Sequence, residues 1–291
     1  MPTGYAKQVK NGEVMKQKSR VSSITYAVIA ALLVGVLVYA GVRALMIYIP
    51  QMNDAHRFEE LKNYAGLDDV NVQELISSAA ETSGTSSEQN SDIRKNNEVS
   101  DGIRKLAAKN SDFVGWLSID DTVIDYPIMK SSESDPEYYL HRDFDRNYSY
   151  SGTLFIGEGC NADSDLFIIY GHNMNAGTMF GSLDSYQDAS FAETHKYIVF
   201  HTVAGYRVYR VFAAFRSKIY KENEDADAFR YYDAVGKTDQ GKYSEYVEAI
   251  RSLSLISMND APVYSQQMML LSTCAYHTDD GRFVVAAYRV A

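Results

Sequence analysis

Two cysteines and six histidines give this 291-residue chain the residue types needed for thiol chemistry. A cysteine nucleophile must react as a thiolate and needs a partner group that accepts and donates protons. Such partners usually meet through the fold rather than through neighbouring positions in the sequence. The surroundings of each cysteine and histidine therefore decide which of them are candidates for catalysis.

The two cysteines lie in different surroundings. Cys160 lies in a polar loop, Gly157-Glu-Gly-Cys-Asn-Ala-Asp163, with turn-forming residues on both sides. Cys274 ends the apolar run Met268-Met-Leu-Leu-Ser-Thr-Cys274, where a rigid strand presents a side chain at a rim. We predict that Cys274 is a free, nucleophilic thiol and that Cys160 is dispensable for the chemistry. A disulfide between them is the alternative, because an even number of cysteines in an exported domain permits one.

One histidine and one arginine occupy comparable positions. His172 ends the run Leu166-Phe-Ile-Ile-Tyr-Gly-His172, in which an apolar stretch is followed by a flexible glycine and a titratable group. His277 lies only three residues after Cys274, but proximity in sequence says little about proximity in the fold. Arg282 opens the last apolar run, and a guanidinium there is suited to stabilise an oxyanion. The alternative for Arg282 is a solvated charge, or one paired with the preceding aspartates.

Short runs rich in Val, Ile, Tyr and Phe must position these groups, with Gly, Asp, Asn and Ser between them. Eight runs are strand candidates: Phe113–Ile119, Val123–Met129, Gly152–Ile156, Leu166–Tyr170, Tyr197–Val203, Tyr206–Phe215, Met268–Thr273 and Arg282–Val290. The best helical spacing is in Lys242–Leu253. Eight strands with few helices predict a mostly-β fold, an eight-stranded barrel with peripheral helices, which leaves no exposed sheet edge.

A long apolar segment precedes this domain. Val21–Val42 contains 22 residues without a charge, and Ala44–Ile49 continues the run after Arg43. A helix of that length spans roughly 33 Å, enough for a bilayer core of about 30 Å. The five basic residues before Val21 predict a cytoplasmic N-terminus and an extracellular remainder. We expect an uncleaved membrane anchor; a signal peptide cleaved near Val38-Tyr39-Ala40 is the alternative.

Composition divides the chain into four parts. We expect a cytoplasmic basic tail over residues 1–20, a transmembrane anchor over 21–49, an extracellular helical and Ser-rich stalk over 50–99 and a catalytic domain over 100–291. Within the stalk, Asp54–Ala80 is expected to be helical with a break near Gly66, whereas Glu81–Ser91 has no large apolar residue and predicts a flexible spacer. An amphipathic stretch, Val99–Asn110, is expected to open the compact domain.

The charge distribution argues against a nucleic-acid partner. The chain carries a net charge of −10, and residues 1–50 contribute +5, which leaves −15 on the rest. Binding to a phosphate backbone requires clustered Lys and Arg, which the acidic body of this chain lacks.

Four ordered blocks resemble the signature blocks of sortases, the cysteine transpeptidases of Gram-positive bacterial surfaces. These blocks are Tyr170-Gly-His-Asn-Met174, Gly177-Thr-Met-Phe-Gly-Ser-Leu183, Leu271-Ser-Thr-Cys274 and Gly281-Arg-Phe-Val-Val285. Four further segments resemble class B sortases in particular. They are Gly115-Trp116-Leu-Ser-Ile119, Ile124-Asp-Tyr-Pro-Ile128, Tyr138-Tyr-Leu140 and the helical insert around Lys242–Leu253. The resemblance covers about residues 100–291.

The resemblance implies a sortase-like barrel in which Cys274 is the nucleophile, His172 the general acid or base, and Arg282 the stabiliser of substrate and oxyanion. It places Thr273 and Ser272 beside the thiol as substrate-binding residues. Such an enzyme cleaves the C-terminal sorting motif of a surface protein, holds the acyl fragment as a thioester on Cys274 and passes it to an amine of a cell-wall (peptidoglycan precursor) peptide. No cofactor and no metal are implied.

Three other functions remain open from the sequence. The accepting amine could be a pilin lysine, in which case the enzyme polymerises pilins. Water could release the acyl group, which would make the protein a cysteine hydrolase. The barrel could also be an inert binding module, in which case Cys274 would not react with a thiol-directed electrophile.

Overall fold

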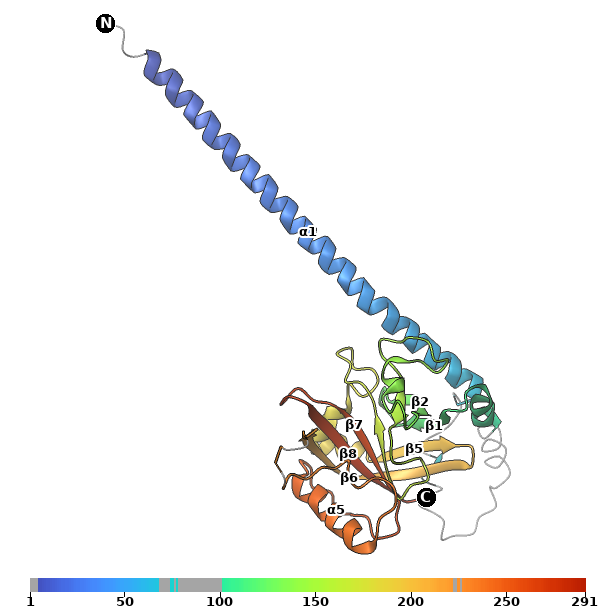
Figure 1. Cartoon of the computed structure of the whole chain (residues 1–291). Helices are drawn as coiled ribbons and strands as arrows, with labels where there is room; N and C mark the ends of the chain where they lie inside the picture. Colours follow the sequence, from blue (N-terminus) through green and yellow to red (C-terminus); the bar gives the residue numbers. More distant parts are fainter. Residues whose placement is uncertain (1–4, 68–73, 76, 78–100, 222–223, 226) are drawn as a thin grey trace. The chain divides into compact units, whose positions relative to one another are not determined.

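The computed structural model describes residues 5–67, 74–75, 77, 101–221, 224–225 and 227–291 (Figure 1). The chain divides into two compact units, residues 1–52 and 53–291. Helix α1 (Tyr5–Ala65) begins in the first unit and ends in the second. Among the described residues, one stretch of helix is long and apolar enough to cross a membrane, namely Thr25–Met46 with a mean hydropathy of 2.3.

Eight strands of the second unit close into a barrel, which confirms the predicted fold. They are β1 (Phe113–Ser118), β2 (Asp125–Lys130), β3 (Leu154–Ile156), β4 (Leu166–Tyr170), β5 (Tyr197–Thr202), β6 (Gly205–Lys218), β7 (Met268–Cys274) and β8 (Gly281–Arg289). The order around the barrel is β1-β2-β3-β4-β7-β8-β6-β5, and β5 pairs with β1 to close it. All eight predicted strands are present; the largest difference in bounds is at β6, which continues to Lys218 instead of ending at Phe215.

Pairing around β7 brings three distant segments to one rim. Strand β4 runs parallel to β7, with Tyr170 opposite Ser272. Strand β8 runs antiparallel on the other side of β7, with Cys274 opposite Arg282. The ends of β4 and β7 and the beginning of β8 therefore lie next to one another, although more than 100 residues of sequence separate the first from the other two.

Both faces of the strands at the centre of this arrangement are buried. Alternate residues such as Phe167 and Leu271 belong to the main hydrophobic cluster, whereas Ile168 and Leu270 belong to a second cluster on the opposite face. Helix α5 (Gln240–Leu253) covers that second face, which confirms the predicted helical insert between β6 and β7 (Figure 1). Because neither face meets water, these strands read as continuous apolar runs.

The core of the second unit also contains residues that precede position 100. Phe58, Leu61, Ala65 and Leu67 are buried in the main cluster. Helix α1 ends immediately before Gly66, whose positive φ of 66° favours glycine, in agreement with the expected break. Residues 101–109 form the expected amphipathic helix, with two fully buried apolar residues, Ile103 and Leu106. The expected spacer Glu81–Ser91 lies outside the described residues.

Three short helices lie between the strands of the barrel. They are η1 (Tyr138–His141), η2 (Leu183–Gln187) and α4 (Ala189–Thr194). The first of them, η1, lies between β2 and β3 in sequence and contributes Leu140 to the wall of the cleft described below.

Candidate active site

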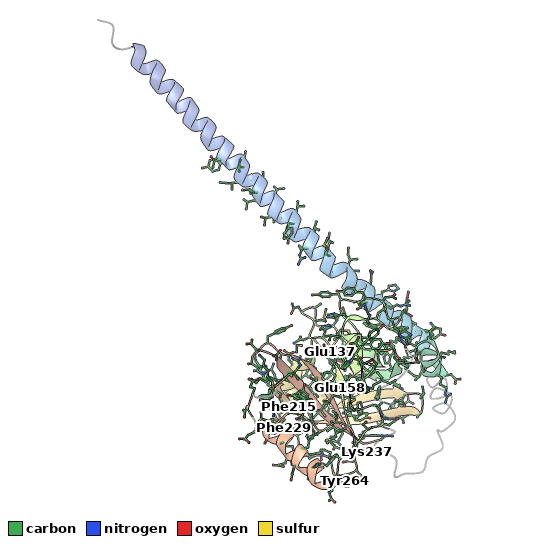
Figure 2. All side chains as sticks on the ribbon, viewed as in Figure 1. Glu137, Glu158, Phe215, Phe229, Lys237 and Tyr264 are labelled. Atoms are coloured by element: carbon green, nitrogen blue, oxygen red, sulfur yellow. The ribbon has the colours of Figure 1, made fainter. Side chains whose placement is uncertain are left out.

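A cleft of about 930 Å³ lies at the rim where β4, β7 and β8 meet. All five predicted site residues line it: His172, Ser272, Thr273, Cys274 and Arg282. Two of the other lining residues, Glu137 and Glu158, are labelled in Figure 2. The fold thus brings together residues that the sequence places in separate blocks.

Cys274 is the last residue of β7, and its side chain is half-buried. Both cysteines carry free thiols, as predicted for Cys274. Two hydrogen bonds fix the end of β7 beside the segment that follows β4: Asn173 Nδ2 donates to Cys274 O at 2.8 Å, and Thr273 Oγ1 donates to Gly171 O at 2.7 Å. The backbone of the thiol-bearing residue is therefore held against the neighbours of His172.

His172 follows β4 after a glycine that the packing requires. A Cβ atom on Gly171 would lie 2.2 Å from Leu154 Cδ2 and 2.8 Å from Phe180 Cδ2, so a larger residue would displace this turn. His172 Nε2 lies 2.9 Å from the carbonyl oxygen of Leu140. A carbonyl only accepts, so Nε2 carries the hydrogen of this bond, and Nδ1 is the nitrogen that accepts a proton in the neutral ring.

The surroundings of His172 favour its neutral form. Burial lowers the pKa of His172, and the neighbouring His141 lowers that pKa further through charge repulsion. The hydrogen bond to the Leu140 carbonyl acts in the opposite direction and raises the pKa. The two imidazole rings have centroids 5.2 Å apart and planes tilted by 40°.

Arg282 is half-buried at the beginning of β8 and lines the cleft. Its Nη1 donates to the carbonyl oxygens of Asp280 at 3.2 Å and Gly281 at 3.0 Å. Among the described residues no carboxylate forms an ion pair with Arg282, so its neighbours Asp279 and Asp280 do not neutralise it in the way the alternative interpretation required. Its positive charge is therefore available to an oxyanion in the cleft.

The hydroxyl groups of Ser272 and Thr273 are engaged within the protein. Ser272 and Thr273 are 1% and 2% exposed, respectively. Ser272 Oγ lies 2.8 Å from the hydroxyl of Tyr231, and Thr273 Oγ1 donates to Gly171 as described above. These bonds hold β7 in place, and the substrate-binding role of the two residues stays a prediction.

Cys160 lies in the predicted loop between β3 and β4, but its thiol is not in polar surroundings. It is 5% exposed, packs in the main hydrophobic cluster and also lines the cleft. The polar residues of the loop face outwards, which leaves the small thiol to fill an apolar gap. Burial raises the pKa of the Cys160 thiol and so disfavours the thiolate that a nucleophile needs.

Four groups near the site were not predicted from the sequence: the carbonyl of Leu140, the ring of His141, the amide of Asn173 and the hydroxyl of Tyr231. Asn173 and Leu140 lie inside the blocks that resemble sortases, which was an available signal for both. His141 directly follows such a block. Within the described part of the chain, no group of three or more His, Cys, Asp or Glu side chains could hold a metal ion.

The family model for the sortase domain matches residues 117–290. The chain belongs to the sortase family. Sortase B of Listeria monocytogenes is 34% identical over 194 residues, which cover 65% of this chain and 74% of that protein. Sortase B of Staphylococcus aureus is 26% identical over 265 residues, which cover 89% of this chain and 94% of that protein.

Solved sortase B structures share the fold of this sortase. The Staphylococcus aureus sortase B–substrate complex superposes with a TM-score of 0.63 at 24% identity, covering 83% of this chain and 98% of that chain. Sortase B of Bacillus anthracis in complex with AAEK1 gives a TM-score of 0.54 at 28% identity, covering 65% of this chain and 83% of that chain. The resemblance to class B is confirmed, and this sortase is a cysteine transpeptidase.

Proposed function

We propose that this sortase cleaves the C-terminal sorting motif of surface proteins, forms a thioester on Cys274 and transfers the acyl group to an amine of a cell-wall peptide. The observation that carries the proposal is the register between β7 and β8, which sets Cys274 opposite Arg282 at the rim where the segment bearing His172 also ends. A sorting-signal substrate and an amine nucleophile are what membership of the family implies.

In the first half of the reaction, the Cys274 thiol passes its proton to Nδ1 of neutral His172, and the resulting thiolate attacks the carbonyl carbon of the scissile peptide bond. The carbonyl oxygen becomes an oxyanion, and the guanidinium of Arg282 stabilises it with fixed hydrogen-bond donors. As the C–N bond breaks, protonated His172 donates the proton on Nδ1 to the leaving amine. The products are a thioester on Cys274, a free amine and a neutral His172.

In the second half, the accepting amine attacks the thioester carbonyl. Neutral His172 takes a proton from this amine at Nδ1, and the new oxyanion again lies against Arg282. Collapse of the intermediate breaks the C–S bond and releases the Cys274 thiolate, which takes the proton back from His172. The bond between His172 Nε2 and the Leu140 carbonyl keeps one ring orientation through both halves.

For the whole chain, we propose residues 1–20 as a cytoplasmic tail, 21–49 as a single-pass anchor, 50–99 as a stalk and 100–291 as the extracellular catalytic domain. The apolar stretch Thr25–Met46 supports the anchor by its length and composition. The basic residues that precede it support a cytoplasmic N-terminus. Labelling single cysteines introduced into residues 1–20 and into the barrel surface, on intact cells, tests this orientation.

Peptide turnover by the full chain in detergent micelles tests the proposed reaction. A library of sorting pentapeptides is supplied with and without an added amine. The masses of the protein and of the peptide products are then measured by mass spectrometry. We expect an acyl adduct on Cys274 and an amide product that forms only with the amine, with Cys274→Ala as the control that forms neither. A free acid product at the same rate with and without amine would identify a hydrolase instead. Supplying a cell-wall peptide or a pilin domain as the amine then compares wall anchoring with pilus assembly.

A further inference from the structure

His141 and His172 form a pair of imidazoles at the edge of the cleft. We propose that His141 is a positioning residue that sets the protonation and orientation of His172, and that the end of α1 holds the segment carrying it. The inference rests on the proposed role of His172 as the acid and base. It adds a second histidine, one that the sequence blocks above do not include, to the proton-transfer apparatus.

Two successive residues of η1 contact His172. Leu140 accepts the hydrogen bond from Nε2 at 2.9 Å, and His141 places its ring beside the imidazole, with centroids 5.2 Å apart. His141 also stacks on Tyr148, with centroids 6.4 Å apart and planes 20° from parallel. The His141 ring therefore contacts both His172 and Tyr148, and its position depends on the loop that carries Tyr148.

Hydrogen bonds within that loop hold it against η1. Ser149 N donates to the carbonyl oxygen of His141 at 3.1 Å, and Arg142 and Tyr148 form an isolated antiparallel bridge. Gly152 N donates to Ser149 Oγ at 2.9 Å. Ser149 thus links the backbone of His141, through two hydrogen bonds, to Gly152 at the end of the loop that carries Tyr148.

The same loop is fastened to the last turns of α1. Asp54 Oδ2 accepts from Ser149 Oγ at 2.8 Å and from Ser151 N at 3.2 Å, and these bonds are partly buried. Arg57 forms an ion pair with Asp145 at an exposed position, where such pairs contribute little to stability. The two bonds of Asp54 therefore connect α1 through Ser149 to His141 and, by ring contact, to His172.

The pair of imidazoles has an electrostatic consequence. A positive charge on His141 opposes a second positive charge on His172, so one proton is favoured on the pair and two are not. The side chain of His141 is exposed to solvent, whereas that of His172 is half-buried. The cleft beside the pair contributes Glu137, Cys274 and Arg282 as charged or titratable side chains. Helix η1 and the loop after it contribute Tyr138, Tyr139, Arg142, Asp143, Asp145, Arg146, Tyr148 and Tyr150.

Two substitutions of His141 separate charge from packing. His141→Phe keeps a ring in contact with His172 and Tyr148 but removes the charge, and His141→Ala removes both the ring and the charge. The full chain in detergent micelles is prepared with histidine carrying ¹³C in the ring, and the resonance of His172 is assigned by its loss in His172→Ala. The pH dependence of that resonance is measured together with kcat and KM for the peptide reaction.

We expect the His172 titration to move to higher pH in both variants, because the repelling charge is gone. In His141→Phe, kcat at its optimum should stay within about threefold of wild type, whereas in His141→Ala it should fall by roughly tenfold with KM unchanged, since a misplaced acid lowers the rate of the chemical step. His277→Phe, at an exposed histidine of the loop after β7, is the matched control and should leave both measurements unchanged.

The connection to α1 is tested by Asp54→Ala, with His56→Ala as the control on an exposed residue of the same helix turn. Asp54→Ala should lower kcat by about threefold to tenfold without changing KM, and His56→Ala should not. An unchanged His172 titration in His141→Phe overturns the proposal, whatever the turnover. Wild-type turnover in His172→Ala would instead overturn the proposed function itself.

Discussion

In the second unit, cysteine and histidine side chains occur both near the rim of the barrel and in buried positions. Cys274 ends β7, His172 follows the end of β4 by two residues, and both are partly exposed in the cleft, which Cys160 lines with a buried side chain. Cys160 and His201 are each only 5% exposed, and His201 lies within β5, opposite Trp116 on one side and Tyr206 on the other. The same functional groups therefore have two environments within one core.

Burial explains why the interior pair is unsuited to catalysis. It raises the pKa of the Cys160 thiol and lowers the pKa of His201 to about 4, so both groups stay neutral under ordinary conditions. A neutral thiol is a poor nucleophile, and an imidazole that does not take up a proton cannot donate one. Position at a strand end, rather than residue type, is what distinguishes the candidates.

The largest difference is expected between the two cysteines. Cys274→Ala should abolish both the acyl adduct and turnover, because no other described thiol at this rim is solvent-accessible. Cys160→Ala should keep most of the activity, since it removes one buried sulfur atom that stays protonated. Intact mass after incubation with peptide measures the adduct in both variants. A native disulfide between Cys160 and Cys274, seen in the same spectra, would contradict this assignment.

The difference in kcat between variants of His172 and His201 should be somewhat smaller than the difference between variants of the two cysteines. His172→Ala should lower kcat by about 10²–10⁴-fold, the usual contribution of general acid–base catalysis. His201→Gln should leave kcat within a few-fold of wild type, because His201 does not line the cleft. Steady-state turnover of one peptide by both variants measures the difference. His277→Ala should also cost little, and a larger loss there than in His172→Ala would reverse the assignment.

Arg282 tests whether the rim needs geometry as well as charge. Arg282→Lys keeps the charge but removes the planar set of donors, and losing such donors to an oxyanion typically costs about 3–4 kcal/mol, or roughly 10²–10³ in rate. The melting temperature should change little, because the guanidinium bonds only to two nearby carbonyls. Turnover and thermal unfolding are measured on the same preparation. Turnover within a few-fold of wild type would make Arg282 a surface charge.

The rim was predictable from the sequence because its residues follow apolar runs. Cys274 and His172 each end such a run, and both faces of β4 and β7 are buried, so the runs are continuous and their ends are distinct. The number and composition of these apolar runs predicted the barrel. The sequence blocks around them, which resemble those of sortases, predicted the sortase class. Loop bounds and strand ends differed by only a few residues.

The remaining features depend on contacts between segments that are distant in sequence. Leu140 and His141 reach His172 from 32 and 31 positions away, and no local pattern shows that contact. Phe58 and Leu61 are buried in the same hydrophobic cluster as the barrel residues. Composition alone assigns them to the stalk, because it does not show that this part of α1 packs against the barrel. Cys160 has polar neighbours in sequence and apolar neighbours in space, which is why its burial was not predicted.

The smallest effect that we predict concerns stability and belongs to the interior. Burial lowers the pKa of His201 from its usual 6.5 to about 4, so the unfolded chain takes up this proton first as the pH falls. The contribution of His201 to stability is therefore complete above about pH 6.5 and declines, by at most about 3 kcal/mol, as the pH falls towards 4. In His201→Gln the free energy of unfolding should fall less steeply over this range, as measured by urea unfolding of the full chain at several pH values. His56→Gln, at an exposed histidine, should keep the wild-type slope. Equal slopes for wild type and His201→Gln would mean that His201 is not held neutral, and the contrast between rim and interior would then hold for the cysteines alone.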